Sequence, residues 1–294
     1  MRTRRSVAHL LFAVTVVIFL QCSTFAEVKN AGFEETAAKA KDDPEIQALE
    51  KLNWTFGEPI LWPTEWGPNP FYASTGIILK ISQENPHAGK NCLFLGQNPN
   101  ASGWALAQTI PVEKGYYRVS FWARGEGKVG AVIDNSFQII PVTQAAADWR
   151  ECVGALPNRA GNMKQICLIL GGIAPGAYFD DVSCEKCNVL DAEVIDESNR
   201  MKADGKWLSD EAPAKQDQFQ SSLTFLSNVV SQLEKFIEAD PRPERLELID
   251  LLKKRGAELK GVDSPSGAVM NEAQALTNIV KRLHKEMSFK DVSE

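Results

Sequence analysis

Residues 116–124 alternate between apolar side chains and aromatic or polar side chains that could bind a ligand. Because successive side chains of a β-strand point to opposite faces of a sheet, every second residue of this segment shares a face. One face is apolar enough for a protein core, and the other presents Tyr116, Arg118, Ser120, Trp122 and Arg124. Sugar rings stack their C–H faces on indole or phenol rings, and sugar hydroxyl groups bind planar donors such as guanidinium. This face therefore predicts a sugar site, and the alternative is that Trp122 packs beneath a loop.

A second concentration of aromatic residues lies in 54–72, where four prolines interrupt it. Proline cannot donate to a β-ladder, so we expect a rigid loop or an edge here instead of a central strand. Trp62, Trp66 and Tyr72 are predicted to stack on the ligand, with core filling as the alternative.

Two acidic residues, Glu34 and Asp180, lie within apolar motifs. A buried carboxylate is costly unless it is hydrogen-bonded, paired or bound to a metal ion. The sequence therefore predicts either an ordinary hydrogen-bonded pair or a cation site. Ligands that bind only through oxygen suit Ca²⁺.

Five short segments occur in a characteristic order along the chain. They are Asn30–Glu34, His87–Leu93, Tyr117–Arg124, Trp149 and Tyr178–Val182. In this order and spacing they resemble the jelly-roll carbohydrate-binding modules of families four, nine and twenty-two, a branch of the galactose-binding-like fold. The resemblance covers roughly residues 28–184. It implies an all-β jelly-roll sandwich that holds a glycan on the concave face of one sheet and does not cut it.

The resemblance also implies a structural Ca²⁺ ion. In the resembled modules a first-strand glutamate and a last-strand aspartate hold this ion together with backbone carbonyl groups. Carried over to this chain, the ligands are the side chains of Glu34 and Asp180 and the carbonyl groups of Gly32 and Lys90. Asp181 replaces Asp180 if the register shifts by one residue.

The chain divides near residue 190. Residues 27–187 contain short β-like runs separated by turn residues, which is typical of an all-β sandwich. Within them, residues 45–52 resemble an inserted short helix that could cover or reshape the cleft. Residues 188–212 are acidic, polar and weakly periodic, and we predict a linker there.

Residues 213–294 carry apolar stripes at helical spacing, such as Phe219, Leu223 and Leu226. Proline-containing breaks divide the stripes into three helices. The prediction is a small α-helical region, either an antiparallel bundle or a coiled coil. Its apolar core is either self-contained or shared with a second copy of the chain or another protein.

The first 26 residues predict a signal peptide. Three arginines precede the apolar run Leu10–Leu20, which is too short for a membrane span, and a cleavage site follows Ala26. We expect the mature protein to be secreted, periplasmic or at the cell surface. Lipidation of Cys22 and retention of the apolar segment as an anchor are the alternatives. After cleavage, no segment of the sequence has the apolar length of an integral membrane span.

The charge of the chain argues against a nucleic-acid partner. The sequence has 32 basic and 38 acidic residues, and removal of the three signal arginines leaves 29 basic residues and a net charge of −9. Nucleic acid instead attracts a basic surface.

Five cysteines remain after cleavage of the signal peptide, an odd number. Cys184 and Cys187 form a lone CxxC pattern, for which we predict a structural disulfide or packed thiols. No recognised catalytic signature occurs in the sequence. It therefore predicts a non-catalytic polysaccharide-binding protein. The alternatives are a scaffold that binds a protein partner through the sandwich or the helices, and an unrecognised hydrolase or lyase.

Overall fold

The computed structural model describes residues 27–69, 74–102, 104–126, 129–133, 138–139, 147–162, 164–172, 176–239 and 241–290. The predicted signal peptide, Cys22 and Tyr72 lie outside the described residues. Predictions about them stay predictions.

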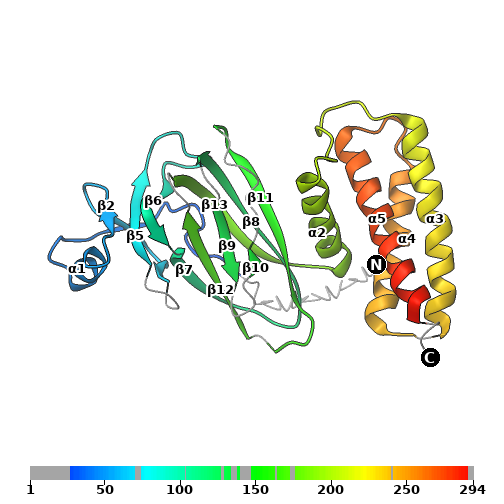
Figure 1. The fold of residues 1–294 in the computed structure, drawn as a ribbon, viewed down its shortest axis with the longest axis horizontal. Helices are drawn as coiled ribbons and strands as arrows, with labels where there is room; N and C mark the ends of the chain where they lie inside the picture. The colour runs from blue at the N-terminus through cyan, green and yellow to red at the C-terminus, as the bar shows by residue number, and fades with distance from the viewer. Residues whose placement is uncertain are drawn as a thin grey trace, which may run out of the picture.

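Two β-sheets form the first part of the protein (Figure 1). The six-stranded sheet has the order β11 (Arg150–Asn158), β8 (Gly115–Glu126), β13 (Gly176–Cys187), β6 (Cys92–Ser102), β5 (Thr75–Ser82) and β2 (Thr55–Phe56). The five-stranded sheet has the order β10 (Gln138–Ile139), β9 (Val129–Ile133), β12 (Gln165–Gly172), β7 (Trp104–Pro111) and β4 (Gly67–Pro68). A short ribbon pairs β1 (Thr36–Ala38) with β3 (Leu61–Pro63).

One apolar core lies between the two sheets, which confirms the predicted β-sandwich. Strand β8 contributes Val119 and Phe121, and β12 contributes Leu168 from the other sheet; all three are completely buried. Because side chains alternate along β8, the residues between them point away from this core. The core face of residues 116–124 is therefore the one predicted from the sequence.

The inserted helix α1 (Pro44–Glu50) forms within the predicted segment. Asp43 caps its first turn, and Ile46 and Leu49 are buried. The helix lies beside β2, at the end of the strand order far from β8 (Figure 1). It therefore does not cover the outer face of β8.

Most of the segment predicted as a linker, 188–212, forms the helix α2 (Val189–Ala203), which was not predicted. The Asn188 side chain caps this helix by accepting a hydrogen bond from the backbone N–H of Asp191 at 2.8 Å. Its buried side includes Glu197, which accepts a hydrogen bond from Asn278. A charged residue on the buried side weakens the apolar pattern from which a helix is recognised.

Three further helices follow, as predicted: α3 (Gln216–Ala239), α4 (Pro243–Lys260) and α5 (Gly267–Lys290). They share a second apolar core with the start of α2. Figure 1 shows α2 between the edge strand β11 and these three helices. None of the helices in the described part of the chain is long and apolar enough to cross a membrane.

No disulfide bond joins the cysteines of the described residues. Cys184 faces the sandwich core opposite Val119, whereas Cys187 lies three residues further along β13 on the other face. Three strand steps separate their Cα atoms by about 10 Å, which is too far for a disulfide. The CxxC pattern is thus a pair of separately packed thiols, and burial raises the pKa of Cys184 to about 12.

Candidate functional site

A loop folds over one end of the six-stranded sheet and positions the candidate site. Residues Gln83–Asn91 connect β5 to β6. The backbone N–H groups of His87 and Ala88 donate to Oδ2 of Asp180 at 2.9 and 3.2 Å. Asp180 lies opposite Trp122 of β8, at a bulge in β13. The bulge and the loop therefore meet beside Trp122.

Asp180 is completely buried, and its carboxylate is satisfied by backbone donors. Its Oδ1 atom accepts a third hydrogen bond, from the N–H of Asp181 at 2.9 Å. Burial raises the pKa of Asp180 to about 6, although the N–H donors act in the opposite direction.

Glu34 fixes the other end of the loop in the same way. Its Oε1 atom accepts hydrogen bonds from the N–H groups of Lys90 and Asn91 at 2.7 and 3.0 Å. Gly89 has a positive φ of 61°, and a side chain at this position would collide with the Glu34 carboxylate. Only glycine fits between the loop and this acid.

The four predicted calcium ligands lie around this corner. The carboxylates of Asp180 and Asp181 and the Glu34 side chain all surround Gly32, since a Cβ atom there would lie 3.4 to 3.9 Å from each of them. Lys90 is joined to Glu34 by the hydrogen bond from its N–H. Within the described residues, no three histidine, cysteine, aspartate or glutamate side chains form a group that could hold a metal ion.

Trp122 stacks on the imidazole of His87. The ring centroids are 3.8 Å apart and the planes differ by 14°. The Nδ1 atom of His87 lies 2.6 Å from Oδ2 of Asp181. The ring of Trp149 meets the imidazole edge-on, at 5.9 Å between centroids.

Arg124 adds its guanidinium to the rings of Trp122, His87 and Trp149. We call these four groups, together with Tyr178, the aromatic row. The guanidinium carbon of Arg124 lies 5.2 Å from the Trp149 ring centroid and 3.9 Å from that of Tyr178. Arg124 also donates a hydrogen bond from Nη2 to the carbonyl oxygen of Glu84. Its Nε atom is buried without a hydrogen-bond partner. The row is thus built from β8, β13 and the loops before β6 and β11.

Polar side chains occupy the middle of the same face. Arg118 pairs with Glu151 of β11 and donates from Nη1 to Oγ of Ser120 at 2.9 Å. The hydroxyl groups of Ser120 and Ser183 lie 2.8 Å apart. Strands β11, β8 and β13 therefore present a connected set of donors and acceptors next to the aromatic row.

Three of the predicted sugar-binding residues have other positions. Trp62 and Trp66 are buried in the sandwich core, with only 5% and 2% of their surfaces exposed. Their indole N–H groups donate to the carbonyls of Trp66 and Asn30. Tyr116, at the other end of β8, packs against the core of the helices and lies under Arg159. None of the three joins the row around Trp122.

His87, Trp149, Tyr178 and Asp181 belong to the site, but none was predicted to bind sugar, and Asp181 was predicted only as an alternative calcium ligand. Their only signal in the sequence is their place within the resembled motifs. Nothing in the spacing of residues 87 and 122 indicates that their rings stack.

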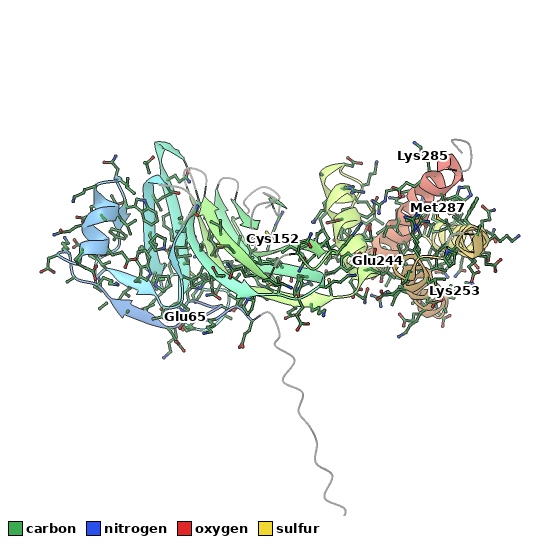
Figure 2. All side chains as sticks on the ribbon, turned by 90° about the horizontal axis from the view of Figure 1, so that it is seen from below. Glu65, Cys152, Glu244, Lys253, Lys285 and Met287 are labelled. Atoms are coloured by element: carbon green, nitrogen blue, oxygen red, sulfur yellow. The ribbon has the colours of Figure 1, made fainter. Side chains whose placement is uncertain are left out.

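The helices contain a cavity of about 320 Å³. Side chains of α3, α4 and α5 line it, among them Ile237, Leu248 and Met287, together with Arg245 and Glu286. Met287 lies near the C-terminal end of α5 (Figure 2).

No protein-family profile matches the chain, and no curated protein matches it either. Among solved structures, it is similar to the CBM22-1 xylan-binding domain of Paenibacillus barcinonensis Xyn10C, with 11% identity, coverage of 42% of this chain and 86% of that chain, and a TM-score of 0.32. It is also similar to a CBM4 structure, with 14% identity, coverage of 54% and 99%, and a TM-score of 0.34. A family 22 carbohydrate-binding module of Clostridium thermocellum Xyn10B gives 12% identity, coverage of 42% and 87%, and a TM-score of 0.32. Likeness at this level does not indicate a function.

The raised pKa of Asp180 predicts how stability changes with pH. The unfolded pKa is 3.8 and the folded pKa is about 6, so the folded state binds the proton more tightly. Stability from this group is fully present below pH 3.8 and is lost as pH rises through 6. In EDTA, the free energy of unfolding of the wild type relative to Asp180→Asn should rise between pH 7 and pH 4 by on the order of 2 kcal/mol. Urea titrations at several pH values measure this difference, and a flat difference would contradict the assignment.

Proposed function

We propose that this protein is a secreted or cell-surface protein that binds a glycan without cleaving it. The site is the outer face of the six-stranded sheet, from Arg118 to Arg124 on β8. The observation that carries the proposal is the joint placement of flat rings and polar groups on one sheet face. Trp122 lies there beside Trp149 and Tyr178, and all three rings are partly exposed.

Each part of this face suits one part of a sugar. A pyranose stacks its C–H face on an indole, and Trp122 supplies that indole. Sugar hydroxyl groups both donate and accept, so they suit Arg118, Glu151 and Ser183 on adjacent strands. The polar groups are already joined by hydrogen bonds, which holds them in position before a ligand arrives.

The proposed function includes no catalytic step. Glycoside hydrolysis needs one carboxyl group to protonate the leaving oxygen and a second to attack or to activate water. Glu151 is held by Arg118, and Asp181 is held by His87. Both carboxylates therefore have binding partners within the protein.

Calcium is a second part of the proposal. The carboxylates of Glu34 and Asp180 and the carbonyl groups of Gly32 and Lys90 offer oxygen ligands only, which fits this ion in kind. Two of these four proposed ligands are acidic side chains, and the other two are backbone carbonyl groups. Bound there, the ion would neutralise the Asp180 carboxylate and fix the loop Gln83–Asn91 to the sheet.

We expect calcium to raise the melting temperature relative to EDTA by several degrees, because an ion that binds only the folded state stabilises it. Glu34→Gln should remove this increase. Magnesium is the control ion. It has the same charge but demands a stricter octahedral site, so it should shift the melting temperature less. Equal melting curves in calcium and EDTA would reject the calcium site and leave Glu34 and Asp180 as hydrogen-bonded anchors.

A glycan array with the full mature chain tests the sugar site. Trp122→Ala should weaken binding at least 10-fold, because it removes the stacking ring. Trp207→Ala is the control, since Trp207 is also partly exposed but lies after α2, outside the strands and loops that form the site. Binding to a polysaccharide that is equal in both variants would place the site elsewhere, and no binding by the wild type and its folded variants would reject the function.

A protein-binding scaffold is the second candidate, and the helices favour it. Arg245 of α4 lines the cavity between α3, α4 and α5, and the next residue, Leu246, has 45% of its surface exposed. An exposed leucine next to a residue that lines an apolar cavity suits contact with a second copy of the chain. We propose that copies associate through this end of the helices.

If copies of the chain associate, the average molecular mass measured by sedimentation equilibrium should rise with protein concentration. Leu246→Glu should return the protein to a monomer, because it places a charge in the apolar contact. Leu208→Glu, at a similarly exposed leucine outside the four long helices, should leave association unchanged. A monomer at every concentration would contradict this proposal.

A further inference from the structure

Resting on the proposed glycan site, we infer that His87 is a gate over Trp122. Its imidazole occupies the face of the indole on which a sugar would stack, and a glycan binds by displacing it. The class of ligand that this exchange favours is a neutral glycan.

The stacking geometry leaves no room for a sugar between the two rings. Their centroids are 3.8 Å apart and nearly parallel, which is the contact distance of two flat groups. A pyranose on this face of Trp122 needs the same space. The imidazole and the sugar therefore compete for one position.

Two contacts hold the gate closed. Asp181 binds Nδ1 at 2.6 Å, and Trp149 packs its ring against the imidazole. Both side chains of the His87–Asp181 pair are partly exposed, at 28% and 38%. Water can replace their hydrogen bond when the gate opens, so opening does not leave a buried group unsatisfied.

The gate opens by rotation of a side chain and not by movement of the loop. The N–H groups of His87 and Ala88 are bound to the buried Asp180. Those of Lys90 and Asn91 are bound to Glu34. The backbone is thus fixed on both sides of the histidine, while its χ1 rotation moves the ring away from Trp122.

A ligand that displaces His87 must take its place beside Asp181, and this decides which ligands can bind. When the imidazole leaves, the Asp181 carboxylate loses its donor and faces the incoming sugar. A hydroxyl group can donate to it, whereas the carboxylate of a uronic acid is repelled. Arg118 is already paired with Glu151, and the Arg124 guanidinium is held over Tyr178 and donates to the carbonyl oxygen of Glu84. Neutral polysaccharides are therefore favoured over acidic ones.

His87→Ala tests the gate with the full mature chain. Binding is measured by titration against the neutral polysaccharides and against a polyuronate as the acidic probe. Affinity of His87→Ala for the neutral glycan should be about 10-fold higher than that of the wild type, as expected if the wild type is open about one tenth of the time. Gln83→Ala is the control, since Gln83 lies in the same loop and contacts Asn91 instead of Trp122.

Tryptophan fluorescence gives a second reading that needs no sugar. Removal of the stacked imidazole should change the emission of Trp122, so His87→Ala should differ from the wild type and from Gln83→Ala. Addition of neutral glycan to the wild type should change the emission in the same direction. If these emission differences disappear when Trp122 is also replaced by alanine, the change in emission comes from Trp122.

The outcomes separate the gate from the glycan site. Tighter binding by His87→Ala, or binding by this variant alone, supports the gate. Equal or weaker binding by His87→Ala overturns the gate and leaves the glycan site in place. Failure of the wild type and of His87→Ala to bind any glycan overturns both. Preference for the polyuronate overturns the assigned ligand class.

Discussion

The buried carboxylate of Asp180 is the constraint on which the candidate site depends. A carboxylate with no exposed surface must find donors inside the protein, and Asp180 accepts from three backbone N–H groups. Two of these groups belong to His87 and Ala88 in the loop between β5 and β6. Satisfying one acid on β13 therefore fixes where that loop crosses the sheet. The imidazole over Trp122 is a consequence of this position.

The bulge in β13 belongs to the same arrangement. Asp181 has a φ of 47°, an uncommon conformation for a residue other than glycine. The irregular register after Asp180 turns the Asp181 carboxylate towards His87 while Asp180 stays buried. Two adjacent acids thereby take different roles, one beneath the loop and one beside the ring.

The sequence predicts the two faces of β8 because a strand alternates with period two, and Val119 and Phe121 are clearly apolar. It could not predict the fate of Trp62 and Trp66. An indole in a proline-rich loop suits either a ligand or a core, and both rings are buried because carbonyl groups from Trp66 and Asn30 satisfy their N–H groups. Such partners are set by tertiary structure.

Tertiary structure also decides why α2 forms and where the polar face of β8 ends, and the sequence predicts neither. Glu193 and Glu197 bind Arg282 of α5, about ninety positions along the chain, so no local pattern reveals why this acidic helix is stable. Once α2 and its partners are in place, Tyr116 packs against their apolar core. The polar face of β8 therefore ends at Tyr116, six residues and about 20 Å from Trp122. In the proposed glycan site, the helices therefore limit how far a ligand could extend along β8 from Trp122.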